Sequence, residues 1–183
     1  MLIVRTIEDK NERHTTISLE MNGAYLTRSI REINTASNGS WLYPHAVDNF
    51  VTLQTTNDKD PAIQPIAQDT LVTWQLDVQD SRANEWNIAF IKMTLINHSR
   101  RTYMRKNSWE RIFRLGIDDQ VAPDGTLYIG TNKEGKFMVQ TQPKIATSYL
   151  IKYSLDFHYA PKRRPAVYYK LDPFIQVHSG GPS

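Results

Sequence analysis

Two clusters of basic residues, each interleaved with or followed by tyrosines, are the groups in this sequence that most directly suggest a chemistry. No acidic residue occurs from position 86 to position 109, and the first cluster lies in this stretch around Tyr103. It comprises Arg100, Arg101, Arg105 and Lys106. The second cluster lies between Pro161 and Pro165. It comprises Lys162, Arg163 and Arg164. Such groups bind phosphates while aromatic rings stack on bases, so the clusters predict contacts with nucleic acid or with an acidic partner.

Alternatives remain for both clusters. The same composition suits an anionic membrane surface or the acidic face of a neighbouring subunit. A solvated basic loop without a function is an equally weighted interpretation.

Large aromatic residues in expected loops form a second set of candidates. They are Trp41, Tyr43, Tyr103 and Trp109. Exposed rings in loops predict an interface or a platform for a ligand. The alternative is that each ring anchors its own loop in the core.

The sequence shows no signature of catalysis or of a metal site. There is no cysteine, which excludes disulfides, thiolate zinc sites and cysteine nucleophiles. The five histidines are scattered, and no phosphate-binding glycine loop or serine nucleophile elbow is present. Two carboxylate pairs, Asp58 with Asp60 and Asp118 with Asp119, have oxygen ligands suited to calcium but lack the spacing of an EF-hand. We therefore expect no catalytic residue, no metal, no cofactor and no enzymatic activity.

The element best placed to organise these groups is a long strand over residues 149–159. Its apolar residues fall on every second position, and Lys152, Ser154, Asp156 and His158 alternate with them. A period of two predicts a strand with one buried and one solvated face.

The rest of the chain repeats this pattern in shorter segments. Residues 2–7 and 15–19 predict two strands around a charged turn. Residues 72–78 alternate, whereas residues 86–96 are apolar on both faces as in a central strand, and together they predict a hairpin. Leu26, Ile30 and Ile33 form one apolar stripe, which predicts a short helix that Asn22 caps and Asn34 ends.

These elements predict an all-β, mainly antiparallel fold, a jelly-roll-like β-sandwich or barrel with one short N-terminal helix. A length of 183 residues fits one domain over 1–183.

Segments 55–69 and 161–183 contain prolines and are predicted to be extended arms that reach between subunits. No apolar run is long enough to span a membrane, and the N-terminus does not read as a signal peptide.

Charge is distributed unevenly along the chain. Residues 1–85 carry seven Lys and Arg against twelve Asp and Glu, whereas residues 86–183 carry fifteen against seven. This asymmetry suits a subunit that docks its basic side on the acidic side of a neighbour. The alternative is that both halves interleave in one sandwich and their fields cancel.

In outline the chain resembles viral jelly-roll coat proteins and related phage structural proteins. The resemblance is architectural, rests on no diagnostic motif and transfers no residue roles. It implies a non-enzymatic structural protein that self-associates into a particle as a capsid, neck, tail or decoration component. Its partners would be itself and other particle proteins, and its location the virion or the host cytoplasm.

Two other functions stay open at this point. The first is a carbohydrate- or protein-binding β-sandwich module that uses the loop aromatics. The second is a nucleic-acid-binding or matrix-like protein that uses the basic clusters.

Overall fold

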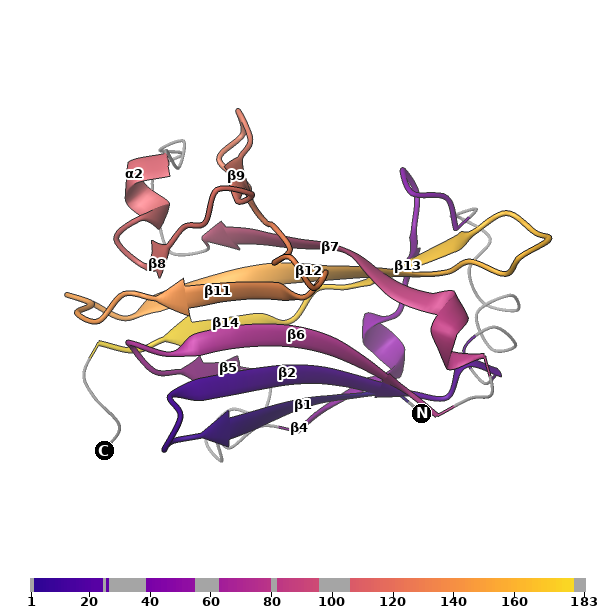
Figure 1. Cartoon of the computed structure of the whole chain (residues 1–183), viewed down its shortest axis with the longest axis horizontal. Coiled ribbons are helices and arrows are strands. Elements are labelled where there is room, and N and C mark those ends of the chain that lie inside the picture. Colours follow the sequence, from indigo (N-terminus) through magenta and orange to yellow (C-terminus); the bar gives the residue numbers. More distant parts are fainter. Residues whose placement is uncertain are drawn as a thin grey trace.

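The computed structural model describes residues 2–24, 26, 39–54, 63–79, 82–95 and 106–179, except for the side chains of Lys106 and Asn107. Within these residues the chain folds into two β-sheets that form a sandwich (Figure 1). The all-β architecture predicted from the period-two segments is therefore confirmed.

Sheet A contains six strands in the order β4-β1-β2-β6-β11-β8. Their bounds are Leu2–Asp9 for β1, His14–Met21 for β2, Val51–Gln54 for β4, Leu71–Val78 for β6, Phe113–Arg114 for β8 and Phe137–Thr141 for β11. Residues of β1 and β2 pair in one unbroken register from Leu2 opposite Met21 to Asp9 opposite His14, which confirms the first predicted hairpin.

Sheet B contains eight strands, with β3-β13-β12-β7-β10-β9 as its main path. The strand β14 pairs with β12 beside β13, and β5 pairs with β14. The bounds are His45–Ala46 for β3, Ile63–Ile66 for β5, Trp86–Leu95 for β7, Gln120–Val121 for β9, Leu127–Ile129 for β10, Tyr149–Tyr159 for β12, Val167–Leu171 for β13 and Phe174–Val177 for β14. The short helical turns are η1 over Asp48–Phe50, η2 over Ala83–Glu85 and α2 over Lys106–Trp109.

The long strand predicted over residues 149–159 is β12, and it is the centre of sheet B. It pairs with β7 on one side and with β13 and β14 on the other. Its buried side chains Ile151, Tyr153, Leu155 and Phe157 occupy alternate positions, so the predicted apolar face is the face that meets the core.

The hairpin predicted for residues 72–78 and 86–96 is wrong. The strand β6 lies in sheet A and β7 lies in sheet B, so the turn between them crosses from one layer to the other. Both strands are apolar because each faces the same core from an opposite side, and alternation alone does not distinguish that arrangement from a hairpin.

The pairing is mainly antiparallel, with four parallel exceptions among the twelve pairs of described strands. The parallel pairs are β1 with β4, β2 with β6, β13 with β3, and β14 with β5. Each joins segments that lie far apart in the sequence, because a parallel pair needs a crossover connection.

The two segments predicted as arms contribute strands to sheet B where they are described. Residues 63–66 form β5, and the second segment supplies β13 and β14. Residues 55–62 and 180–183 lie outside the described residues. The predicted N-terminal helix also falls largely on residues 25 and 27–38, which lie outside them, although Leu26 is buried and its N–H donates to the Asn22 carbonyl at 3.2 Å.

Aromatic rings fill one end of the core. Trp86 of β7 packs against Phe157, Tyr159 and Tyr169, with ring centroids 6.2, 4.9 and 5.7 Å away. Burying a side chain such as Phe157 contributes about 1.5–3 kcal/mol. Three strands, β7, β12 and β13, are therefore joined by rings at this end of sheet B.

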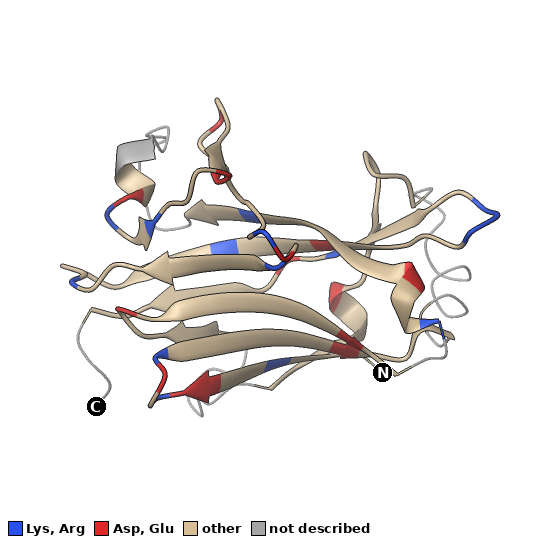
Figure 2. Ribbon diagram, in the orientation of Figure 1, with Lys and Arg blue, Asp and Glu red and all other residues tan. Residues whose placement is uncertain are grey.

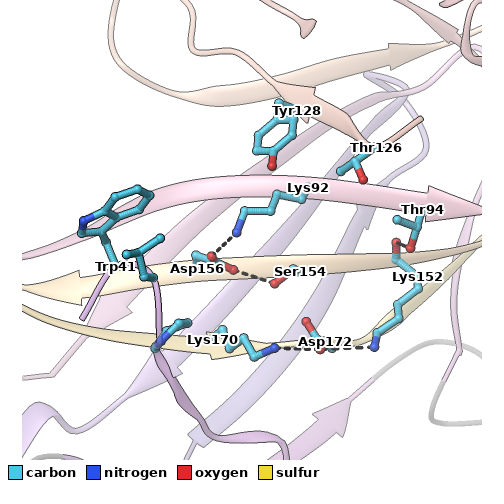
Figure 3. A pocket seen from close by; sticks show the side chains of 12 residues that line it. Trp41, Lys92, Thr94, Thr126, Tyr128, Lys152, Ser154, Asp156, Lys170 and Asp172 are labelled. Atoms are coloured by element: carbon cyan, nitrogen blue, oxygen red, sulfur yellow. Dashed lines mark hydrogen bonds and ion pairs between the residues drawn. The ribbon is translucent and has the colours of Figure 1, made fainter. Parts of the chain in front are cut away.

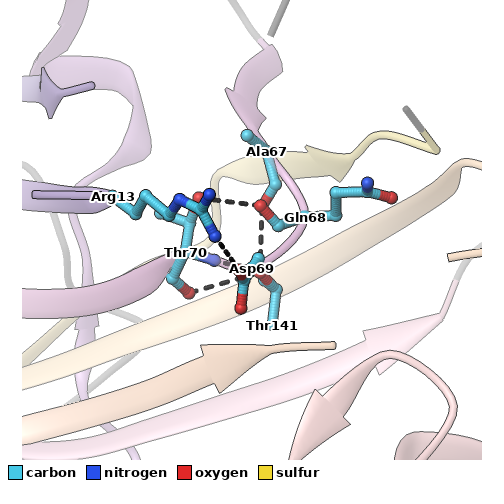
Figure 4. A network of polar contacts seen from close by, with 6 residues as sticks. All are labelled: Arg13, Ala67, Gln68, Asp69, Thr70 and Thr141. Atoms are coloured by element: carbon cyan, nitrogen blue, oxygen red, sulfur yellow. Dashed lines mark hydrogen bonds and ion pairs between the residues drawn. The ribbon is translucent and has the colours of Figure 1, made fainter. Parts of the chain in front are cut away.

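The opposite end of the sandwich is joined by a polar network around Thr141 (Figure 4). Its hydroxyl accepts the Thr70 N–H at 2.8 Å and lies 2.9 Å from the Ala67 carbonyl, to which it donates. Arg13, in the β1–β2 turn, forms an ion pair with Asp69. Because Leu71 N–H also donates to the Arg13 carbonyl at 2.8 Å, the network fixes where β6 begins beside β2.

A buried hydrogen bond joins β5 and β12, two strands of sheet B that are separated by β14. The Tyr153 hydroxyl donates to Gln64 Oε1 at 2.9 Å, and both side chains are fully buried. Burial raises the pKa of Tyr153, so the hydroxyl remains a neutral donor. The bond gives a buried polar group on β5 the partner that it needs.

We expect Tyr153→Phe to lower the free energy of unfolding by about 1–2 kcal/mol, because it leaves Gln64 Oε1 buried without a donor. Urea denaturation measures the change, with Tyr128→Phe as the control because that ring is 36% exposed on the surface. Equal stability of the two variants would contradict a contribution from the core hydrogen bond.

Candidate binding surface on sheet B

The outward face of sheet B carries the main concentration of chemically useful side chains in the described structure. Along β12 the residues between the buried positions point outward, so Lys152, Ser154 and Asp156 share one face. The register places Lys92 of β7 opposite Ser154, and Lys170 of β13 opposite Asp156. Three neighbouring strands thus contribute to one polar surface.

Asp156 organises the centre of this surface. Its side chain is only 4% exposed, and Oδ2 lies 2.5 Å from Lys92 Nζ. The other carboxylate oxygen accepts from the Ser154 hydroxyl at 2.6 Å. Both oxygens are therefore engaged, and they hold the Lys92 ammonium and the Ser154 hydroxyl in fixed positions.

Asp172, which follows β13, organises the second half. Its Oδ2 lies 3.2 Å from Lys152 Nζ and 3.6 Å from Lys170 Nζ. Burial by itself would raise the pKa of Asp172, but the interaction with Ser154 and the positive charges of Lys170 and Lys152 outweigh it. The pKa therefore lies below its ordinary value, and the carboxylate remains charged at neutral pH.

These side chains line a depression of about 340 Å³. Trp41, Leu42 and Pro44 from the loop before β3 also line it, and so do Thr126 and Tyr128 at β10. Figure 3 shows Lys92 and Asp156 between Trp41 and Tyr128. The depression therefore combines a charged floor with an aromatic ring on two of its sides.

The segment that carries Trp41 is held by its backbone. Gly39 adopts a φ of +67°, which side chains rarely allow, and a Cβ at that position would lie 2.6 Å from His45 Nε2. Both the backbone conformation and the lack of space therefore favour glycine at position 39. The Gly39 carbonyl accepts the Tyr168 N–H at 2.7 Å, and the Ser40 hydroxyl accepts the Tyr43 N–H at 3.1 Å. Trp41, Leu42 and Tyr43 are nevertheless 62, 61 and 65% exposed.

The structure separates the aromatic candidates of the sequence analysis. Trp41 and Tyr43 are exposed, as an interface or a platform requires, and Trp41 lines the depression. Trp109 is fully buried, and its indole N–H donates to the Gly125 carbonyl at 2.9 Å. It therefore anchors α2 in the core, which was the stated alternative, and it is not available to a partner in this structure. Tyr103 lies outside the described residues.

The basic candidates are described only in part. Arg100, Arg101 and Arg105 lie outside the described residues, and so does the side chain of Lys106. The second cluster occupies the turn between β12 and β13, and its members are all exposed. They are Lys162, Arg163 and Arg164, and Figure 2 shows them at one end of the molecule.

Most residues of the depression received no role in the sequence analysis. The period of two identified Lys152, Ser154 and Asp156 as outward positions, but Lys92 and Asp172 come from other strands and other parts of the sequence. Only the register of β7, β12 and β13 brings them together. No spacing along the chain carries that signal.

Comparison with known proteins finds no similarity that identifies a family. No protein-family model matches the chain, and no curated protein matches its sequence significantly. Among the described residues there is no group of three His, Cys, Asp or Glu side chains arranged to hold a metal ion. The same residues contain no helix long and apolar enough to cross a membrane.

We expect Asp172→Asn to lower stability at neutral pH by on the order of 1 kcal/mol, because the variant loses its charged contacts with Lys152 and Lys170. Because the folded-state pKa of Asp172 is depressed, this stabilisation is complete above the unfolded-state pKa and is lost as the pH falls through the folded one. Denaturation at about pH 7 and about pH 2 measures it, and the deficit of the variant should vanish in acid. The exposed Asp77 provides the control, Asp77→Asn, and an identical pH profile for both variants would contradict the assignment.

Proposed function

We propose that the chain is a non-enzymatic structural protein that self-associates into a particle, and that the particle is a virion with the chain as a capsid, neck, tail or decoration component. The partners are further copies of the chain and other particle proteins. The observation that carries this proposal is the run of three exposed apolar residues Trp41, Leu42 and Tyr43 in the loop before β3.

Single exposed apolar residues are common, but three consecutive large ones form a patch that favours burial. Here the hydrogen bonds of Gly39 and Ser40 hold the backbone of this segment in place. A second copy that covers the three side chains removes apolar area from water with little further ordering of the segment. This favours an interface with a copy of the chain.

Most sheet edges support association through side chains rather than through sheet extension. The edge strands β3, β8 and β9 each have two residues, β5 contains Pro65, and β4, the other edge of sheet A, has four residues. Short edge strands and proline disfavour the addition of a strand from another chain. The apolar run before β3 is therefore the better route to a contact between copies.

Two turns of opposite charge favour one relative orientation of neighbouring copies. The β12–β13 turn carries Lys162, Arg163 and Arg164. The end of β1 and the turn that follows it carry Glu8, Asp9 and Glu12 with Lys10 and with Arg13, whose charge is paired with Asp69. All eight residues are exposed, and the two turns lie towards opposite ends of the long axis (Figures 1 and 2). Attraction between unlike turns of adjacent copies favours a head-to-tail arrangement.

The second candidate function is a binding module for carbohydrate or protein. The position of Trp41 at the border of the charged depression favours it. The basic β12–β13 turn suits phosphates and carboxylates alike, so it does not by itself favour nucleic acid over an acidic protein surface.

We expect the purified chain to form a large species, and the combined substitution Trp41→Ser, Leu42→Ser and Tyr43→Ser to reduce it to a monomer, because it removes the apolar contact. Size exclusion with light scattering measures the mass. Ile117→Ser is the matched control, because Ile117 is 98% exposed but stands alone on another part of the surface. A monomeric parent protein, or equal loss of assembly in the control, would contradict the proposal.

We expect Arg163→Glu with Arg164→Glu to weaken assembly, and the further changes Glu8→Lys and Glu12→Lys to restore it, because the unlike charges are then exchanged. Asp9 stays unchanged because its carboxylate accepts the N–H groups of Asn11 and Glu12 at 3.0 and 3.1 Å and shapes the turn. Light scattering at about 0.15 M and about 1 M salt measures both effects. If the fourfold variant assembles no better than the double variant, the head-to-tail pairing of the turns is excluded.

A further inference from the structure

The depression on sheet B has the dimensions of a small-ligand site. Its volume of about 340 Å³ lies in the range of about 300–1,000 Å³ that is typical of such sites. It is open, and the exposed indole of Trp41 and the partly exposed ring of Tyr128 border it from different elements. A ring-shaped ligand with an apolar face finds aromatic contact there.

The floor of the depression is polar and already ordered. Asp156 is satisfied by Lys92 and Ser154, so it does not need a ligand for its own stability. Its effect is to hold an ammonium group and a hydroxyl group in fixed positions at the base of the depression. Thr94 and Thr126 add two further hydroxyl groups to the lining. This set of donors and acceptors suits the hydroxyl groups of a sugar.

The charge of the lining selects further among ligands. Lys92, Lys152 and Lys170 face the carboxylates of Asp156 and Asp172, which leaves one net positive charge. The lysine side chains remain 30, 41 and 37% exposed. An ammonium has three donors, so each lysine can contact a carboxylate of the protein and an anionic group of a ligand together.

The same lining disfavours a phosphate. It contains no arginine to form the two-pronged contact that phosphates favour. A doubly charged anion would also approach the carboxylates of Asp156 and Asp172 closely. A singly charged carboxylate matches the net charge of the lining.

We propose that this depression binds an acidic carbohydrate, in which the sugar ring packs on Trp41 and a ring carboxylate binds the ammonium groups of Lys152 and Lys170. Lys92, held by Asp156, donates a hydrogen bond to a sugar hydroxyl, and the Ser154 oxygen, whose proton is donated to Asp156, accepts one from another. The proposed contact between copies also covers Trp41, so sugar binding is a property of the unassembled chain. The contacts of Lys152 and Lys170 distinguish the two proposals, because these lysines take no part in the contact between copies.

Tryptophan fluorescence tests the site directly. The other three tryptophans are 0 to 5% exposed, so a ligand-dependent change in accessible fluorescence reports on Trp41. We expect a trisaccharide of galacturonate to change the signal in a saturable manner. The neutral galactose trisaccharide should bind at least tenfold more weakly, and inorganic phosphate should not compete.

Substitution of the lysines identifies the contact. Lys170→Gln and Lys152→Gln should each weaken binding of the acidic trisaccharide by about tenfold or more, since each removes a charged hydrogen bond. Lys136→Gln is the matched control, because Lys136 is 65% exposed and pairs with Glu134 away from the depression. The control should bind like the parent protein. All of these residues are partly or fully exposed, so the variants should fold.

Each other result overturns the inference. Equal binding of the neutral and acidic trisaccharides excludes the role of charge. If the acidic trisaccharide does not bind, or if the lysine variants bind it like the parent protein, the charged cluster has a purely structural role. If inorganic phosphate competes with the trisaccharide, the depression is a general anion site. Tyr43→Ser separates this inference from self-association, because Tyr43 does not line the depression: it should weaken assembly and leave sugar binding intact.

Discussion

The alternation of β12 is the constraint on which the rest of the molecule depends. Eleven residues in one extended strand place Ile151, Tyr153, Leu155 and Phe157 in the core and the residues between them on the opposite face. A shift of one residue in its pairing would exchange the two faces. The same register that fills the core with rings therefore also positions the lysines and aspartates of the outer surface.

Asp156 shows how closely these two roles are joined. A carboxylate that is 4% exposed is costly unless it is paired and hydrogen-bonded. Lys92 from β7 and Ser154 from the same strand meet that requirement. The irregularity in the β12–β7 register falls between Asp156 and Phe157, immediately beyond this group. The two strands therefore pair regularly up to this group and irregularly immediately after it.

The sequence was sufficient for the fold class and for several elements, but not for the arrangement. Alternation identified β6 and β12, because it follows from facing one core. The charged turn between two short strands identified β1 and β2, and an apolar run identified β7. The parallel pairs could not be predicted, since they join distant segments and leave no local pattern. The two-residue strands β3 and β9 are too short to show any period. Residues 63–66 form β5, but they were predicted as part of an extended loop because the segment contains prolines.

The candidate surface could be predicted only in fragments for the same reason. Trp41 and Tyr43 stood out as large rings in a loop, and Lys152, Ser154 and Asp156 as the polar half of an alternation. What makes them a site is their proximity to Lys92, Lys170 and Asp172, which pairing between strands creates. Trp109 shows the opposite case, because a loop ring with the same sequence signal is fully buried.

The pairing of β5 with β14 has a consequence for how the molecule acquires its structure. Ile63 lies opposite Phe174, so β5 has no neighbour in its sheet until the segment after β12 and β13 has been made. Gln64 of β5 also finds its hydrogen-bond donor on β12. Contacts between such distant segments carry a large loss of chain entropy before they form. We therefore infer a slow folding step in which sheet B closes late, with the exposed β5 segment as the part of the nascent chain most in need of protection from aggregation.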